Sequence, residues 1–263
     1  RLCYMSFGRG RKYIEDFVSN LLTKGDGSVF EHVNYGFVIT GVSRSLTHEL
    51  VRHRAGFAFS QRSQRFVDES DSPFVVPPAL SENREGTEEG RRIFADAIRS
   101  ASSSYGELVD ALEKSLPKDM FPEWRDRRKA IRQAARAVLP NATETKIFVT
   151  ANVRAWRHFI GMRGASYADW EIRRLALIIL DLLQKEAPLL FGDFVVEDLP
   201  DGTQIGVFLL EDGSVQAFGA GGNGKVGHRF VEKLVEFDQA PVGSDPMVGV
   251  DQVVAALELS DAV

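Results

Sequence analysis

Residues 52–66 read RHRAGFAFSQRSQRF, and the interpretation of the chain starts from this stretch. Four arginines fall within fourteen positions, mixed with phenylalanine, glycine, serine and glutamine and with no acidic residue among them. Ordering several guanidinium groups beside apolar rings is costly unless an anionic, planar group lies between them. The stretch therefore favours a site for a phosphorylated, aromatic ligand. The alternatives are a basic surface strand and a set of internal salt bridges.

The rest of the composition describes an ordinary globular protein. The chain has 263 residues, of which 44% are hydrophobic and 26% charged, and its formal net charge is −5. This acidic balance argues against a general nucleic-acid-binding protein. No apolar run reaches the ~18 to 20 residues that span a bilayer, and no signal peptide is recognisable. The single cysteine, Cys3, excludes an intramolecular disulfide and suits a reducing cytoplasm.

Apolar periodicity predicts several helices and a few short strands. The helices are expected at residues 13–23, 43–51, 87–116, 124–139, 152–162 and 169–186. Extended segments are expected at residues 33–42, 57–67 and 145–150, and a glycine-rich loop at residues 25–32. This alternation predicts a fold in which helices pack around a sheet.

The composition shifts after residue 194, where glycine becomes frequent. The pattern IGVFLL-EDG-SVQAF at residues 205–218 predicts a β-hairpin with an Asp-Gly turn. Residues 231–237 and 250–259 look helical. We therefore expect a main domain over residues 1–194 and a small C-terminal appendage of hairpin and helix over residues 195–263.

The triplet Arg52-His53-Arg54, followed by Ser63 and Arg65, resembles the signature of the flavin-dependent thymidylate synthases. Other blocks of that family follow in the same order along the chain. They are residues 25–32 (GDGSVFEH), residues 135–140 (ARAVLP), Asn152 with Arg154, His158 with Phe159, Arg163, and residues 168–173 (ADWEIR). The resemblance covers roughly residues 1–194.

This resemblance implies an α+β fold, with helices around a mixed central sheet, assembled as a homotetramer with FAD sites at subunit interfaces. The implied reaction is FAD-dependent reductive methylation of dUMP to dTMP at C5, with methylenetetrahydrofolate as carbon donor and NADPH as reductant. One alternative is C5-methylation of UMP in nucleoside-metabolite synthesis. A second alternative is a flavin- or nucleotide-binding homologue without catalytic activity. No metal, nucleic-acid or membrane partner is implied.

The resemblance also assigns site residues. FAD would be bound by Ser28, Arg52, His53, Arg54, Asn152, Arg154 and His158. The nucleotide would be bound by Glu49, Gln61, Ser63, Gln64, Arg65, Arg136 and Arg163. Arg163 would be catalytic, because a guanidinium against the pyrimidine stabilises negative charge on a carbonyl oxygen as C5 becomes nucleophilic.

Four features depart from the family pattern. The spacer between Arg54 and Ser63 has eight residues, one more than in most members. Asp26 occupies a position where many members carry histidine, Glu49 replaces a frequent glutamine, and Phe66 replaces the usual tyrosine. These changes bear on substrate choice and rate. An extra residue enlarging the space beside the ribose predicts better tolerance of UMP than in typical members.

Other chemistries have weaker support. Cys3 has no activating neighbours for attack on C6 of a uracil ring. Ser63 lacks the GxSxG elbow of a nucleophilic serine. The spacings of His32, His48 and His53 match no common zinc pattern. Residues 219–225 (GAGGNGK) fit the phosphate-binding G-x-x-x-x-G-K pattern, but Val226 stands where a hydroxyl is needed, so a flexible glycine loop is expected.

Overall fold

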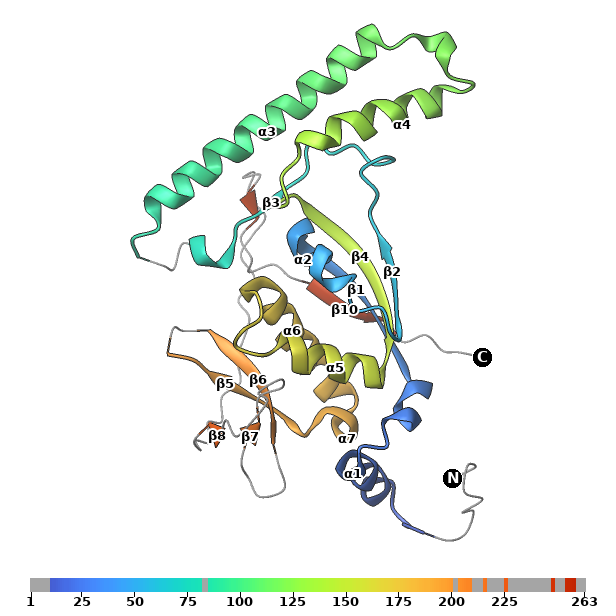
Figure 1. The fold of residues 1–263 in the computed structure, drawn as a ribbon, viewed down its shortest axis with the longest axis vertical. Helices are drawn as coiled ribbons and strands as arrows, with labels where there is room; N and C mark the ends of the chain where they lie inside the picture. The colour runs from blue at the N-terminus through green and yellow to red at the C-terminus, as the bar shows by residue number, and fades with distance from the viewer. Residues whose placement is uncertain are drawn as a thin grey trace.

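The protein is an α+β structure built on a four-stranded sheet (Figure 1). The computed structural model describes residues 10–81, 85–200, 203–209, 215–216, 225–226, 247–248 and 254–258. Its helices and 3-10 turns are α1 (Ile14–Lys24), η2 (Gly27–His32), α2 (Arg44–Leu50), η3 (Pro78–Leu80), α3 (Glu88–Ser115), η4 (Lys118–Met120), α4 (Trp124–Ala135), η5 (Arg136–Val138), α5 (Val153–Arg163), α6 (Trp170–Glu186) and α7 (Pro188–Phe191). Its strands are β1 (Asn34–Ser43), β2 (Phe57–Gln61), β3 (Phe74–Val75), β4 (Glu144–Asn152), β5 (Phe194–Asp198), β6 (Gln204–Leu209), β7 (Val215–Gln216), β8 (Lys225–Val226), β9 (Met247–Val248) and β10 (Val254–Glu258).

The central sheet has the strand order β10-β1-β4-β2. All three of its pairings are antiparallel, whereas the expected sheet was mixed. Among the described strands, the parallel pairing is the short contact of β3 with β9 beside this sheet. Local sequence patterns predict where strands lie but carry no information on which way neighbours run. The α+β class is confirmed, and the mixed sheet is corrected to an antiparallel one.

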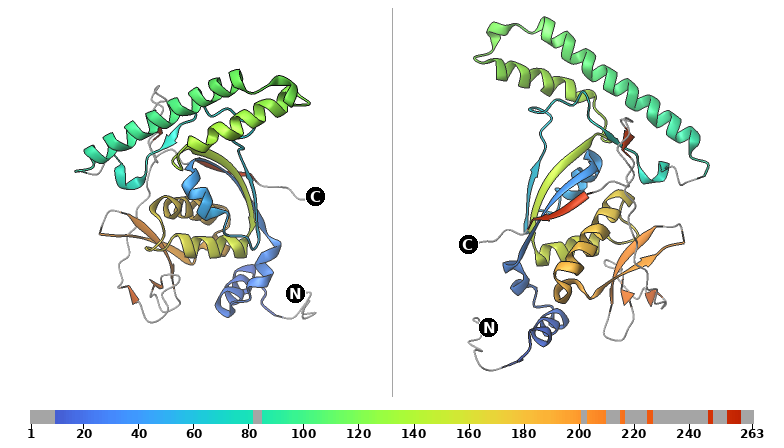
Figure 2. Two further views of the ribbon diagram at one scale, coloured as in Figure 1. Left: turned by 45° about the horizontal axis from the view of Figure 1, so that its top comes forward. Right: turned by 180° about the vertical axis from the view of Figure 1, so that it is seen from behind.

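One face of the central sheet forms the core. Alternate residues of β1 and β4, such as Phe37, Ile39 and Val149, are fully buried against α5 and α6. The ring of Trp156 on α5 stands edge-on to that of Phe37, with centroids 5.1 Å apart. Figures 1 and 2 show α2, α5 and α6 on this face of the curved sheet. On the other face Phe148 remains 39% exposed.

The long helix α3 and the antiparallel α4 form a hairpin that extends across one end of the sheet (Figure 2). Of the 28 residues of α3, Ile98 and Tyr105 are the buried ones. Large apolar side chains on the hairpin, including Ile93, Met120 and Trp124, are more than half exposed. The predicted helices at residues 87–116 and 124–139 are confirmed, except that the second one ends in the 3-10 turn η5.

The segment after residue 194 contains the expected hairpin, because β6 pairs antiparallel with β7. Its first strand also pairs with β5, giving a sheet of order β5-β6-β7-β8. The prediction of a helix at residues 250–259 is wrong, since β10 lies there and pairs antiparallel with β1. Alanine and leucine give that stretch a helical pattern, and the unpaired edge of β1 overrides it. The predicted helix at residues 231–237, most of the loop at 219–225 and Cys3 lie outside the described residues.

A buried carboxylate anchors α2 to α6. Ser43 caps the first turn of α2 by accepting a hydrogen bond from Leu46 N. The backbone N–H and the hydroxyl of Ser43 both donate to the carboxylate of Glu171, at 2.7 and 2.6 Å. Burial raises the pKa of Glu171, with the two hydrogen bonds from Ser43 acting in the opposite direction. The start of α2, the helix that carries Glu49, is thereby tied to the first turn of α6.

The raised pKa of Glu171 predicts how stability depends on pH. A carboxyl whose pKa is raised in the folded state stabilises the protein below its ordinary value of 4.5, and this contribution is lost as pH rises through the raised pKa. Glu171→Gln should therefore gain stability relative to the wild type as pH rises above 4.5, as measured by Tm. Glu171→Ala, which leaves Ser43 N without its acceptor, should lose about 1–3 kcal/mol. A Glu171→Gln variant whose Tm falls relative to that of the wild type as pH rises would contradict this account.

Candidate active site

The guanidinium of Arg163 lies at the centre of a three-residue cluster. Arg163 is the last residue of α5, and its Nε donates to Nε2 of His53 at 2.8 Å. Its Nη1 donates to Oε2 of Glu49 at 2.7 Å. Glu49 lies on α2, and His53 lies in the turn that follows α2. The structure therefore brings together three predicted site residues that are up to 114 positions apart in the sequence.

His53 is held as a neutral imidazole. Its ring lies against Phe159 at 5.3 Å and Phe57 at 6.0 Å between centroids, with His158 at 6.2 Å. Burial, followed by the charges of Arg163 and His158, lowers the pKa of His53 from 6.5 to about 4. Because Nε2 accepts a hydrogen bond from Arg163, the proton of the neutral ring is on Nδ1. His53 thus orients Arg163 through one nitrogen and offers an N–H donor through the other.

The predicted flavin-binding residues gather around the N-terminus of α5. Asn152 caps this helix, and its Oδ1 accepts from Ala155 N at 2.9 Å. Gly27, next to Ser28 in η2, lies so close that an added Cβ would be 3.2 Å from Nε of Arg154. Ser28 and Arg154 are exposed, and Arg154 forms an ion pair with Glu31 at 2.5 Å.

Three further members of this set lie next to His53, Arg52 and Arg54 in sequence and His158 in space. Arg52 and Arg54 are exposed in the turn after α2, and His158 is exposed on α5 beside His53. A helix N-terminus with guanidinium, hydroxyl and imidazole donors matches the chemistry that binds a diphosphate. The donor set present here therefore fits FAD.

The remaining predicted nucleotide residues lie at the other end of β2. Gln61, at the end of the strand, donates from Nε2 to Thr47 Oγ1 at 3.0 Å, which places its amide under α2. The turn that follows contains Ser63, Gln64 and Arg65. Within it Gln64 Nε2 and Arg65 Nε are buried without a hydrogen-bond partner in the protein. Buried donors of this kind are rare in native proteins, and an anionic ligand would satisfy them.

Arg136 lies in the same neighbourhood. Its charge, together with that of Arg62, is among the causes that lower the pKa of Arg44, after burial and against the opposing effect of Glu69. Arg136 is half-buried in η5, directly after α4. Within one chain, the assigned residues thus form one group around Arg163 and α5 and a second group in and near the Ser63 to Arg65 turn.

A buried ionic network supports this second cluster. The sequence interpretation kept internal salt bridges as an alternative but did not identify their members. Arg62 donates to Glu69 at 2.9 Å and to the backbone oxygen of Glu144 at 3.1 Å. Arg44 donates to the backbone oxygen of Arg62 at 2.9 Å, which fixes the end of β2 where Ser63 begins its turn. The available signal was Arg62 itself, an arginine of the opening stretch that matched no motif position.

The long spacer after Arg54 is accommodated near Asn152. Residues of β2 pair with β4 without a register break, and Arg62 N continues the ladder to Lys146 O at 2.8 Å. In the turn before Phe57, Gly56 has φ +77° and an added Cβ would lie 2.8 Å from Asn152 Nδ2. Extra room beside the ribose from this spacer stays a prediction, because the turn lies on the proposed flavin side.

The C-terminal hairpin contacts the loop that follows Arg163. Gly206 N on β6 donates to Gly164 O at 2.9 Å. Arg173, only 2% exposed, donates to Ser166 O and to Thr203 Oγ1, both at 3.1 Å. The backbone on the C-terminal side of Arg163 is therefore held by residues beyond position 194.

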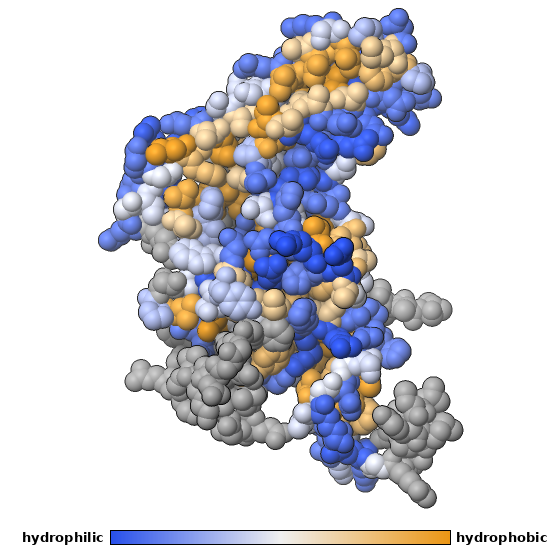
Figure 3. Space-filling view, viewed as in Figure 1, coloured by the Kyte–Doolittle hydropathy of each residue, from blue (hydrophilic) through white to orange (hydrophobic). Residues whose placement is uncertain are grey.

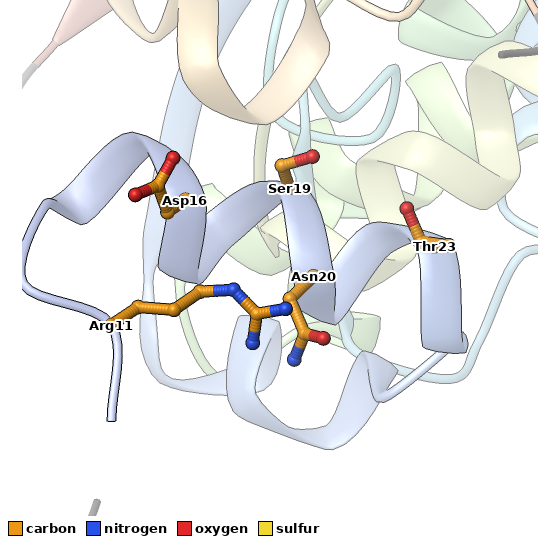
Figure 4. A pocket seen from close by; sticks show the side chains of 5 residues that line it. All are labelled: Arg11, Asp16, Ser19, Asn20 and Thr23. Atoms are coloured by element: carbon orange, nitrogen blue, oxygen red, sulfur yellow. The ribbon is translucent and has the colours of Figure 1, made fainter. Parts of the chain in front are cut away.

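A hollow on the surface of α1 contains no predicted site residue. It is lined by Arg11, Asp16, Ser19, Asn20 and Thr23, and the Arg11 side chain extends along the helix toward Asn20 (Figure 4). Within the described ranges, no three His, Cys, Asp or Glu side chains gather as a possible metal site. None of the helices in that part of the chain is long and apolar enough to cross a bilayer.

Comparison with known proteins finds one family over most of the chain. A family model described as thymidylate synthase complementing protein matches residues 1–189. A protein of Mycobacterium sp. (strain KMS) named flavin-dependent thymidylate synthase is 47% identical over 210 residues, covering 78% of this chain and 81% of the relative. Relatives with the same name from Mycobacteroides abscessus and Mycobacterium tuberculosis (strain ATCC 25177 / H37Ra) are 48% and 47% identical. They cover 79% and 78% of this chain, and 81% and 80% of their own lengths.

The state of His53 can be measured directly. Its imidazole resonances should titrate near pH 4 in the folded protein, and near the ordinary 6.5 after unfolding in denaturant. Assignment follows from the signal lost in His53→Gln. Because the folded pKa is lowered, the contribution of His53 to stability is present above pH 6.5 and is lost as pH falls toward 4. A folded-state titration near 6.5 would show that the imidazole is not held by Arg163 as described.

Proposed function

The chain belongs to the flavin-dependent thymidylate synthase family, and from that premise we propose that it converts dUMP to dTMP. The reaction is a reductive methylation at C5 that uses FAD, methylenetetrahydrofolate as carbon donor and NADPH as reductant. The observation that carries the proposal is the cluster around Arg163, in which a guanidinium is fixed by Glu49 and by a neutral His53.

Arg163 has the chemistry that the pyrimidine requires. C5 of uracil becomes nucleophilic as negative charge moves onto a ring carbonyl oxygen, and a preorganised guanidinium stabilises that charge. A guanidinium has five N–H donors, and the two contacts seen here use one on Nε and one on Nη1. The other three remain for the ring of the nucleotide. Because His53 is neutral, it does not compete with Arg163 for the developing negative charge.

The residues around the N-terminus of α5 would hold the flavin. Ser28, Arg154 and His158, with Arg52 and Arg54, supply hydroxyl, guanidinium and imidazole donors to a negatively charged cofactor. Reduced FAD, when bound, supplies the hydride of the reaction. The helix N-terminus capped by Asn152 adds a favourable electrostatic potential for the diphosphate.

We further propose that each nucleotide site is shared between two copies of the chain. His53 packs against Phe57 at the start of β2. The chain rises about 16 Å from Phe57 to Arg62, at ~3.3 Å per residue. Arg163 contacts His53 near the start of this strand, and the Ser63 to Arg65 turn follows its end. In this arrangement Arg163 of one copy and Arg65 of another complete one site.

The surface of the chain supports such an assembly, which we propose to be a homotetramer. Figure 3 shows an apolar band along the α3–α4 hairpin. Exposed apolar patches of this kind mark interaction surfaces, and the open face of the central sheet presents Phe148. We also propose the cytoplasm as the compartment, supported by the single cysteine. The division into a domain over residues 1–194 and an appendage over 195–263 stays a proposal.

Purified protein incubated with dUMP, methylenetetrahydrofolate, NADPH and FAD should form dTMP. Arg163→Ala should retain FAD but lose about a hundred- to thousandfold in rate, the usual cost of removing a donor from a developing oxyanion. A parallel assay with UMP compares the two kcat/KM values and tests the alternative substrate. Bound FAD with no turnover of either nucleotide would favour a non-catalytic homologue and refute the proposal.

Mixing two inactive variants tests the shared site. Arg163→Ala and Arg65→Ala copies, co-expressed in equal amounts, should recover activity, because some sites then combine an intact Arg163 with an intact Arg65. Each of the two copies at a site carries the required intact residue with a chance of one half. Random assembly therefore predicts that about a quarter of the sites are intact, compared with the wild type. A mixture that stays as inactive as either variant alone would place both residues in a site within a single copy.

A further inference from the structure

Glu49 makes a contact that the resemblance did not imply. It was expected to bind the nucleotide, yet its carboxylate lies 2.7 Å from Nη1 of Arg163. The side chains of Arg163 and Glu49 are 21% and 34% exposed, so the pair is partly shielded from solvent. Surface ion pairs contribute little to stability, which leaves the effect on Arg163 itself as the main consequence of this pair.

We propose that Glu49 is a positioning residue that orients Arg163 and offsets its charge, and so sets how strongly this enzyme binds and activates the pyrimidine. This proposal deepens the function proposed above and rests on it. The role is distinct from contact with the nucleotide, because Glu49 acts through the guanidinium.

The geometry accounts for the orienting part of the role. A guanidinium is planar, and contacts to two different nitrogens fix both its position and the direction in which its remaining N–H groups point. His53 holds Nε and Glu49 holds Nη1. Glu49 is itself placed on a helix whose start is anchored by Ser43 and Glu171. Among the residues that the structure describes, removing the Glu49 side chain leaves His53 as the one contact of the Arg163 guanidinium, which can then rotate about it.

The charge accounts for the tuning part. A carboxylate in contact with Arg163 compensates part of the positive charge that would otherwise act on the carbonyl oxygen of the pyrimidine. The field of the Glu49 carboxylate extends to its neighbours, since it is among the causes that raise the pKa of Glu171, after burial and Asp169. An amide at this position accepts the same hydrogen bond from Nη1 without the negative charge.

Two substitutions at position 49 separate the two effects. Glu49→Gln keeps the hydrogen bond and removes the charge, so the affinity for dUMP and kcat/KM should rise, by about tenfold for a change equivalent to one pKa unit of interaction. Glu49→Ala removes both, and kcat should fall by about a hundredfold, as expected when a reacting group is misplaced by about 1 Å. Both variants should keep wild-type FAD content.

The matched control is Asp181→Asn, which removes a carboxylate from the exposed Asp181–Lys185 pair on α6 and should change neither kcat nor KM. Affinity for dUMP is measured by calorimetry alongside turnover, so that the ranking of the variants can be obtained even if the wild type forms no dTMP. Absence of turnover in the wild type would refute the proposed function alone. Equal or weaker dUMP binding by Glu49→Gln would overturn the charge effect. Wild-type kcat and dUMP affinity in Glu49→Ala would overturn the positioning role.

Discussion

The antiparallel pairing of β1 with β4 is the constraint on which the active site depends. Asn34 pairs with Asn152 at one end of the ladder, and Ser43 pairs with Glu144 at the other. The chain leaves β1 through α2 and leaves β4 through α5, so the two helices start from opposite ends of the same sheet face. The ladder is about 33 Å long, and the helices are about 10 and 16 Å long. Their C-terminal ends therefore meet over the middle of the sheet, where Glu49 contacts Arg163.

This meeting of helix ends also suits a cation. The C-terminus of a helix carries partial negative charge, which favours a guanidinium in its last turn. Arg163 occupies that place on α5, and Glu49 adds a full negative charge from α2. The same surroundings contain two imidazoles, His53 and His158, and the positive charge of Arg163 is one of the causes, after burial, that lower the pKa of His53.

Sequence patterns predicted the elements and the motif residues but not how they combine. Helical spacing located α5 and α6 because each buries an apolar stripe, whereas residues 254–258 have a helical composition and form a strand because β1 offers them a free edge. The arginines of residues 52–66 predicted a ligand site, but in the structure they do not all have the same surroundings. Arg52 and Arg54 are exposed, while Arg62 forms the internal salt bridges that were the alternative interpretation. The contact of Glu49 with Arg163 spans 114 positions, and no local pattern encodes it.

The position of Arg163 also depends on the C-terminal hairpin. This hairpin lies beyond the segment that the family model matches, which ends at residue 189. Arg163 is held at its guanidinium by Glu49 and His53, but its position also depends on the backbone that follows it. Gly164 O accepts from Gly206 N, and a Cβ on Gly164 would lie 3.5 Å from Gly206, an ordinary contact distance. The same Cβ would lie only 2.7 Å from Ile160 O on α5, so the end of that helix leaves little room for a side chain at this position. Arg173, buried between this loop and Thr203, secures the same junction from α6. The described residues of the hairpin therefore belong to the structure that orients Arg163, through Gly206 N and through Thr203 Oγ1 just before β6.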